Sequence, residues 1–283
     1  MKTSVRTARR PAVSTCVPFT LNFEGHCARF PFIFGEKPVT SIGNDPAPSC
    51  LISGREAGDM VFRLPNKNRD AFFRAQGIPA EKVYSLFQVH SRDVFTVPDV
   101  CAREGDGMVS FSYGVFPAVT VADCLPVFLL DTKNGFFAVL HSGWKGTGIV
   151  IKALEIMRQA GSKPQAIAAV LGPCIQSCCY KVDEERARNF EKEFGLGSSQ
   201  ISSSGTDGYP LGNVIRTDDS GWYIGLQAAN ARLLATAGVQ HIAYCTNCTF
   251  TDTRLGSFRR EGAETYTRMI AMGGVNFPLP LPH

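Results

Sequence analysis

The segments QVHS (88–91), ADCLP (122–126) and HSGWKG (141–146) decide the fold, because each is a short polar segment set between apolar runs. The apolar runs cover residues 115–121, 127–130 and 136–140, and they are rich in β-branched and aromatic side chains. Gly, Pro or Asp residues bound each run. Short apolar runs with such boundaries predict buried strands, so we expect the polar segments to lie at strand ends.

Three side chains in these polar segments are types that a transition metal prefers: His90, Cys124 and His141. Two imidazoles and one thiolate leave the fourth position of a tetrahedral site open. Their spacing matches no zinc-finger or H-E-x-x-H pattern, so the fold would have to assemble such a site. The alternative is structural, since a strand-end histidine is often a hydrogen-bonded core residue and a lone cysteine is often a small buried apolar group.

A second functional hypothesis uses two of these residues as a nucleophile and its base. A Cys124 thiolate stabilised by the His141 imidazolium would be the centre of a thiol hydrolase. Asp123 would then orient a ligand, or it would only cap the strand end. The glycine-rich segment 143–148 leads into a predicted helix, where free backbone N–H groups suit a phosphate or a carboxylate.

The composition is that of an ordinary globular protein, with 283 residues, 44% hydrophobic and 19% charged, and a formal net charge of +4. A small net charge, without a basic run interleaved with aromatic residues, gives no case for nucleic-acid binding. The sequence contains no apolar run long enough to span a membrane. We therefore expect a cytoplasmic protein with neither a nucleic-acid nor a membrane partner.

The N-terminal segment 1–22 is basic and contains no acidic residue. Its apolar stretch is interrupted by polar residues and proline, which argues against a signal peptide. We expect residues 1–22 to be a frayed extension and residues 23–283 to form one domain.

The ten cysteines show no spacing typical of a disulfide scaffold, so we expect them to be reduced. Five of them could form a structural zinc knot or a redox pair: Cys174, Cys178, Cys179, Cys245 and Cys248. A lone C-x-x-C pattern is weak, and buried or incidental free thiols are the simpler interpretation.

The hydrophobic pattern predicts helices at 66–77, 146–160, 183–194 and 222–237, and further strands at 82–89, 165–171 and 241–245. The strand 82–89 would place His90 at its end, and Asp183 is the expected N-cap of the third helix. Asp106-Gly107 predicts a tight turn. With no internal repeat and no linker, the simplest architecture is a single α+β domain with a mixed β-sheet flanked by helices.

Six motifs occur in the order typical of the YfiH family, and the chain resembles that family from about residue 68 to residue 272: QVHS, TVADCLPV, HSGWKG, LGPCI, YKV and SFRREG. Members of the family have been called multicopper polyphenol oxidoreductases, laccase-domain proteins and purine nucleoside phosphorylases. The resemblance implies a single α+β domain with a complex mixed sheet, related to the fold of the cytotoxic necrotising factor deamidases. It also implies a zinc ion, with copper as the alternative, held by His90, Cys124 and His141.

The resemblance implies an enzyme that cleaves adenosine, inosine or methylthioadenosine with phosphate and that also deaminates adenosine. Cys124, His141 and His90 would be its catalytic residues, and the chain would act as a monomer on a small molecule. Candidate cations for the phosphate are Lys145, Arg69, Arg259 and Arg260. At Lys145 the family usually has arginine, so the planar fork of the guanidinium is absent here.

Three alternatives stay open at this point. A cysteine amidase using Cys124 and His141 would fit a role in peptidoglycan precursor editing. A polyphenol oxidase needs several histidine-rich copper sites, and this chain has five histidines in all. A metal-binding partner protein without enzymatic activity is the third alternative.

Overall fold

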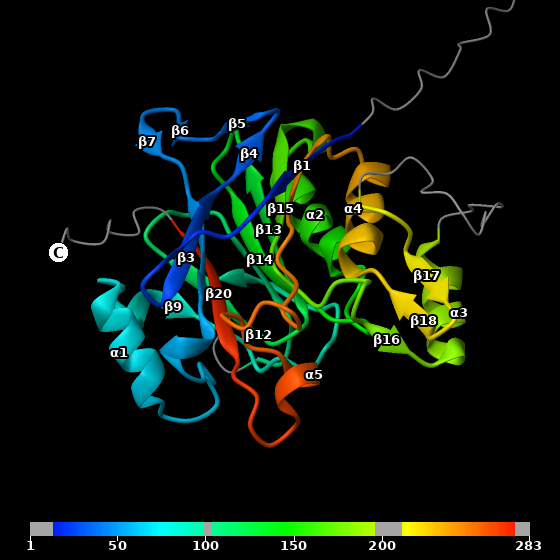
Figure 1. Ribbon diagram of the computed structural model, residues 1–283. Coiled ribbons are helices and arrows are strands. Elements are labelled where there is room, and N and C mark those ends of the chain that lie inside the picture. The colour runs from blue at the N-terminus through cyan, green and yellow to red at the C-terminus, as the bar shows by residue number, and fades with distance from the viewer. Residues whose placement is uncertain (1–13, 99–102, 196–210, 275–283) are drawn as a thin grey trace, which may run out of the picture.

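Two β-sheets packed face to face form the centre of the molecule (Figure 1). The computed structural model describes residues 14–98, 103–195 and 211–274. The first sheet has seven strands in the order β1 (Thr15–Phe19), β19 (His241–Cys245), β15 (Ile167–Leu171), β13 (Leu125–Asp131), β14 (Phe137–Ser142), β11 (Gly107–Ser110) and β10 (Val94–Val97). The second has six in the order β2 (Phe23–Glu24), β3 (Cys27–Pro31), β8 (Ser49–Ser53), β20 (Met269–Gly274), β12 (Phe116–Val121) and β9 (Val83–Tyr84). Both sheets mix parallel and antiparallel pairs.

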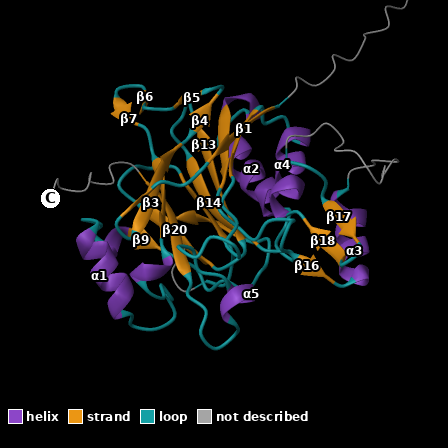
Figure 2. Ribbon diagram, in the orientation of Figure 1, coloured by secondary structure: helices purple, strands orange, loops and turns teal. Residues whose placement is uncertain are grey.

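Helices cover the outer faces of the two sheets, which gives four layers (Figure 2). The seven-stranded sheet is covered by α2 (Ile149–Gln159) and α4 (Leu226–Thr236), and the six-stranded sheet by α1 (Lys67–Ala75). Helix α3 (Glu184–Phe194) packs on α4 and on the small sheet named next. The smaller elements are the sheet β16 (Lys181–Val182), β18 (Gly221–Ile224) and β17 (Ile215–Asp218), the hairpins β4 (Ile33–Phe34) with β5 (Lys37–Pro38) and β6 (Ser41–Ile42) with β7 (Asp45–Pro46), helix α5 (Phe258–Glu261), and the 3-10 helices Arg55–Ala57, Ala80–Lys82 and Pro164–Ala166.

Strand β13 shows why the central strands are apolar throughout. Val127 and Leu129 point to the helical layer, whereas Phe128 and Leu130 point to the second sheet. Side chains alternate between the two faces of a strand, and here both faces are covered, so all seven residues of β13 are buried. The predicted strands at 115–121, 127–130 and 136–140 are thus confirmed as parts of β12, β13 and β14.

Two predicted helices are confirmed with small shifts of their first residue. The helix at 146–160 begins at Ile149, because Gly148 precedes it in the left-handed region with φ 103°. The free backbone N–H groups of the helix start, which were predicted to bind an anion, therefore lie at Ile149 and not at Gly146. Helix α3 has the expected N-cap, since Asp183 accepts a hydrogen bond from the backbone N–H of Arg186 at 2.8 Å.

The predicted strand at 82–89 is wrong beyond Tyr84. Strand β9 contains only Val83–Tyr84, and the chain reaches His90 through a loop. The side chain of Gln88 takes the place of a strand partner there, because its amide donates to the carbonyl of Thr120 at 2.8 Å and accepts from the N–H of Thr120 at 2.7 Å. His90 itself has φ 61°.

The predicted helix at 222–237 is wrong at its start. Residues Gly221–Ile224 form β18, which pairs with β16 and β17, and the helix begins at Leu226. An aromatic and β-branched quartet, once it finds strand partners, adopts extended structure in preference to helix.

The prediction that residues 1–22 form a frayed extension is wrong for its second half. Thr15–Phe19 form β1, which pairs in parallel with all five residues of β19. Pro18 interrupts the apolar pattern, but β1 is the outermost strand of its sheet, where proline is tolerated. Residues 1–13 lie outside the described residues.

Among the described residues, the helices are all too short or too polar to cross a bilayer.

Candidate active site where the chain crosses between the sheets

A cavity of about 550 Å³ lies where the chain passes from one sheet to the other. Residues 122–124 connect β12 of the six-stranded sheet to β13 of the seven-stranded sheet. The antiparallel register of β13 with β14 sets Pro126 opposite His141, so the start of β13 adjoins the end of β14. Cys124 and His141 are therefore neighbours in space and both line the cavity.

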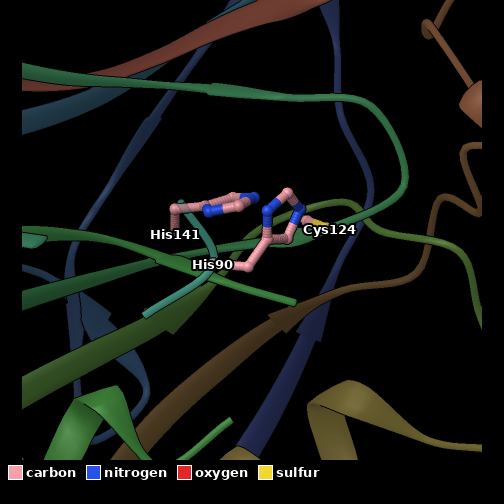
Figure 3. Close-up of side chains that lie close together, drawn as sticks. All are labelled: His90, Cys124 and His141. Carbon is pink, nitrogen blue, oxygen red and sulfur yellow. The ribbon is translucent and has the colours of Figure 1, made fainter. Parts of the chain in front are cut away.

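His90, Cys124 and His141 converge at this point (Figure 3). One sulfur or ring nitrogen from each lies within 4.8 Å of the others, and the imidazole rings are 4.9 Å apart at 71°. His141 is buried, Cys124 is half-buried, and His90 is exposed to the cavity. A thiolate and two imidazoles at this separation are the donor set of a transition-metal site with one open position. The residues present therefore fit a metal ion.

Asp106 fixes the position of both histidines. It is fully buried, and its carboxylate accepts from Nδ1 of His141 at 2.7 Å and from the backbone N–H groups of His90 at 3.1 Å and Ser91 at 2.7 Å. The bond to Nδ1 leaves Nε2 of His141 as the free nitrogen facing the cluster. The sequence analysis assigned Asp106 only to a turn, and it missed this role.

The three groups also change each other's protonation. Burial alone would raise the pKa of Cys124, but the His141 charge and hydrogen bonds from both histidines lower it to about 6. Burial alone would lower the pKa of His141, but the Cys124 thiolate and Asp106 raise it to about 9. Between these values the pair is a thiolate and an imidazolium, the state in which cysteine is a nucleophile or a metal ligand.

Gly143 is required next to the cluster. A Cβ atom at this position would lie 2.9 Å from Sγ of Cys124 and 3.1 Å from Cδ2 of His90. Any side chain would therefore displace at least one of the two groups.

Asp123 has φ 83° and is buried beside Cys124. Its carboxylate accepts from the hydroxyl of Thr249 and from the backbone N–H of Arg259, both at 2.6 Å. Asp123 thus ties the Cys124 turn to the segment that contains α5.

Of the four cations predicted to contact phosphate, one lines the cavity, namely Arg259. Lys145 is exposed, with its ammonium 5.4 Å from the centre of the Trp144 ring, and is not among the lining residues. Arg69 donates to the carbonyl of Val61 at 2.7 Å and supports the loop beside the cavity. Arg260 is committed to the carbonyl of Phe250 and to Glu261. These three do not line the cavity, so their contact with phosphate stays a prediction.

Three further arginines, which were not among the four predicted phosphate contacts, line the cavity: Arg63, Arg186 and Arg268. Arg268 forms a bidentate ion pair with Asp59, with N–O distances of 2.7 and 2.8 Å. Arg63 and Arg259 donate instead to backbone carbonyls, those of Gln88 at 3.4 Å and Lys181 at 2.9 Å. A carbonyl does not neutralise a guanidinium, so the cavity is suited to an anionic group.

Aromatic side chains form much of the remaining wall: Phe62, Trp144, Tyr180, Phe258 and Tyr266. The rings of Phe258 and Tyr266 meet edge to face with centroids 5.0 Å apart. Phe258 is 47% exposed, which leaves one face of its ring available to a planar ligand.

The other described histidines do not form a second cluster. His26 is exposed beside Glu56, and His241 packs on Phe34 and accepts from the N–H of Gly35. Within residues 14–98, 103–195 and 211–274, the groups of donors close enough for a metal are the site above and a set of three cysteines. A multicopper oxidase needs several histidine-rich copper sites, whereas the described residues hold one donor group that contains histidine, the site above.

The described cysteines form no disulfide with one another. Cys101 lies outside the described residues.

Comparison with known proteins shows which sequences and folds this chain resembles. A purine nucleoside phosphorylase of Corynebacterium glutamicum is 34% identical over 229 residues, which are 78% of this chain and 85% of that protein. An adenosine deaminase, RL5, of an unknown prokaryotic organism is 33% identical over 165 residues, which are 54% of this chain and 58% of that protein. The crystal structure of YlmD from Geobacillus stearothermophilus has a TM-score of 0.71 at 23% identity, over 90% of this chain and 98% of that one. The predicted single-domain α+β fold is thereby confirmed.

The family model described as multi-copper polyphenol oxidoreductase laccase matches residues 54–275. The match includes the Asp59–Arg268 ion pair, all three candidate metal ligands and the arginines of the cavity. The chain therefore belongs to this family, the YfiH family that its motifs resemble.

Proposed function

We propose that the chain is a zinc-dependent purine nucleoside phosphorylase. The observation that carries the proposal is one cavity in which a His–Cys–His donor set lies beside aromatic walls and beside arginines, two of which, Arg63 and Arg259, donate to backbone carbonyls. The relative from Corynebacterium glutamicum bears that name, and the name of RL5 adds deamination of adenosine as a second reaction for the same cavity.

Zinc fits the ligands His90, Cys124 and His141, and when bound it would supply a Lewis acid able to polarise an oxygen or to acidify a water molecule. Asp106 keeps the Nδ1 proton of His141 in place, so that Nε2 stays available as a ligand. Gly143 keeps the space beside Cys124 free.

Phosphate would bind at the arginine side of the cavity. Arg259 and Arg63 donate to backbone carbonyls, whereas Arg186 lies 3.6 Å from a carboxylate oxygen of Asp183 and stacks on Trp144 with its guanidinium carbon 4.6 Å from the ring centre. Guanidinium groups bind phosphate oxygens in a bidentate manner, which orients the nucleophile as well as attracting it. Phe258 would stack on the purine base and hold it in the same cavity.

The test is to incubate zinc-replete protein with inosine or adenosine, with and without phosphate, and to measure free base and ribose 1-phosphate by chromatography. We expect base release that requires phosphate. Arg259→Ala should raise the KM for phosphate at least about tenfold, the loss of one charge-assisted contact. Lys145→Ala is the matched control, since it removes a cation outside the cavity lining. Base release without phosphate, or an unchanged KM in Arg259→Ala, would contradict the proposal.

A cysteine amidase is the second candidate, and the Asp106–His141–Cys124 alignment favours it, because a nucleophile, a base and an orienting carboxylate follow one another there. The two candidates differ in how Cys124 reacts with iodoacetamide. As a zinc ligand it should resist alkylation until a chelator is added, whereas as a free nucleophile it should react at once in zinc-replete protein. Immediate alkylation together with chelator-resistant amide hydrolysis would favour the amidase.

A further inference from the structure

A second group of three thiols lies outside the cavity lining. Cys178 and Cys179 belong to the turn before β16, and Cys248 belongs to the loop after β19. Their sulfur atoms all lie within 4.8 Å of one another, and those of Cys178 and Cys179 are 3.4 Å apart. Cys178 is exposed, Cys179 is half-buried and Cys248 is buried, so the group opens to solvent on one side.

The three sulfur atoms are close enough together to bind one cation with small side-chain adjustments. With metal–sulfur bonds of about 2.3 Å, tetrahedral geometry sets two sulfur ligands roughly 3.8 Å apart. A disulfide between Cys178 and Cys179 fits less well, because successive Cα atoms lie about 3.8 Å apart, below the range of about 4.4–6.8 Å that disulfides normally span. Three thiolates without a carboxylate or imidazole favour soft cations such as Zn²⁺ or Cu⁺.

The backbone holds the two loops in the arrangement that such a site needs. Cys174 and Cys248 form an isolated parallel bridge, and the N–H of Thr249 donates to the carbonyl of Cys174 at 3.0 Å. The N–H of Gln176 donates to Sγ of Cys248 at 3.4 Å. Backbone N–H groups directed at sulfur stabilise thiolates and are a regular outer-shell feature of cysteine metal sites.

We propose that Cys178, Cys179 and Cys248 form a second metal site, for a thiophilic d¹⁰ cation, Zn²⁺ or Cu⁺. Each thiol gives up its proton to solvent as the cation binds, and the open side of the group leaves a further position for water. No electron transfer is involved.

A cation here would join the two loops that support the cavity. The turn with Cys178 and Cys179 lies between Ile175 and Tyr180, which both line the cavity. Thr249, next to Cys248, donates to Asp123 beside Cys124. Metal bound to the three thiols would therefore stabilise the wall of the active site from behind.

The first experiment counts zinc per chain on full-length, reduced protein, by equilibrium competition with a chromogenic zinc chelator. We expect two zinc ions in the unaltered protein and one in Cys178→Ser/Cys179→Ser. Cys16→Ser, which removes a thiol of β1, should still bind two. Equal stoichiometry of both Zn²⁺ and Cu⁺ in the unaltered protein and the double variant would overturn the proposal. A parallel titration with Cu⁺ under anaerobic, reducing conditions, against a cuprous chelator, distinguishes the two cations.

The second experiment does not depend on folding of the double variant. In a His90→Ala background, where the active-site ligand set is broken, Zn²⁺ or Cu⁺ should slow the alkylation of Cys178 and Cys179 by iodoacetamide at least tenfold, measured by peptide mass spectrometry. Alkylation that is equally fast with and without both cations would overturn the proposal. So would an intact mass showing that Cys178 and Cys179 are oxidised to a disulfide in protein purified under reducing conditions. Neither result depends on turnover of nucleosides, so failure here is separate from failure of the proposed function.

Discussion

Asp106 is the residue on which the active site depends most, although it contacts the cavity only through others. One buried carboxylate orients the ring of His141 and closes the loop that contains His90. A carboxylate that accepts several hydrogen bonds can fix two ligands from distant parts of the chain without joining them covalently. Asp106 is thus a positioning residue for the metal ligands.

The first prediction concerns Asp106→Asn. The amide keeps the size of the side chain but replaces one acceptor oxygen with a donor, so it conflicts with the N–H groups that the carboxylate accepts. We expect zinc affinity and kcat/KM to fall by about 10–100-fold, as for other residues that orient metal ligands. Competition with a zinc chelator measures the first and the nucleoside assay the second.

Asp131→Asn is the matched control for that prediction. Asp131 is also fully buried and accepts from two backbone N–H groups. It is the last residue of β13, at the end of the strand away from Cys124. It should lower stability and leave zinc affinity unchanged. Equal zinc affinity in Asp106→Asn and Asp131→Asn would contradict the assigned role.

At the residue scale, the sequence predicted the donor set but not what surrounds it. His90, Cys124 and His141 stand out because their side chains are unusual in short segments between buried apolar runs. Asp106 does not stand out, because Asp-Gly is also typical of a plain turn. Arg63 and Arg186 resemble any surface arginine until the fold places them at the cavity.

At the scale of elements, the four-residue helix α5 depends on Glu261. The Glu261 side chain is 7% exposed, and it accepts from the backbone N–H groups of Ser257 at 3.0 Å and Thr267 at 2.8 Å. Arg260 donates to the same carboxylate at 2.8 Å. A helix this short has little stability of its own, so these contacts determine where Phe258 and Arg259 lie.

The second prediction concerns Glu261→Gln and its pH dependence. Burial would raise the pKa of Glu261, but the N–H groups of Ser257 and Thr267 and the charge of Arg260 outweigh it and lower the pKa. A lowered pKa in the folded state means that the carboxylate stabilises the protein above its unfolded pKa, and that this stabilisation is lost as the pH falls through the folded pKa.

We therefore expect Glu261→Gln to lower the free energy of unfolding by about 1–3 kcal/mol at pH 7. The difference from the unaltered protein should shrink below about pH 4.5, the ordinary pKa of a glutamate. Urea unfolding at several pH values measures it. Glu264→Gln, on an exposed residue of the same segment, should have no comparable effect, and a pH-independent difference for Glu261→Gln would count against the argument.

The element boundaries that were predicted wrongly have one physical cause. Thr15–Phe19 becomes a strand because β19, distant in the chain, supplies its hydrogen bonds. Gly221–Ile224 pairs with its neighbour β17 and, on the other side, with Lys181–Val182, which lies far back in the chain. Local periodicity contains no information about such partners. Helix α3 was predicted correctly because its N-cap, its charges and its apolar face all belong to one segment.

At the scale of the molecule, the interior between the two sheets holds the active site in place. Phe128 is fully buried there and meets the ring of Phe30 edge to face, with centroids 5.7 Å apart. Residues of both sheets belong to the same hydrophobic cluster. The rigidity of residues 122–124, which connect β12 to β13 and include Cys124, therefore depends on the contact between the two sheets.

The third prediction concerns Phe128→Ala. Removing this ring leaves a cavity between the sheets, and we expect the free energy of unfolding to fall by about 3–5 kcal/mol. Chemical denaturation at neutral pH measures the loss. Phe250→Ala, on a ring that is 37% exposed, should cost less than about 1 kcal/mol, and similar losses in both variants would contradict the assignment of Phe128 to the interior.

The whole architecture was predictable only in part. Runs of apolar residues showed that the central strands are buried on both faces, and the motifs implied one α+β domain. They did not show that β12 and β13 belong to different sheets, because a strand covered on both sides has the same composition in either sheet.

The side chain of Gln88, bonded to both backbone groups of Thr120, has a consequence for how the protein behaves in a crowded solution. Beyond the short strand β9, the rim of β12 would otherwise present a donor and an acceptor ready to recruit a strand from another molecule. A side-chain amide satisfies both groups without continuing the sheet, so it ends the hydrogen-bonded ladder there. The same contact that fixes the loop before His90 thus also protects the protein from aggregation by strand addition.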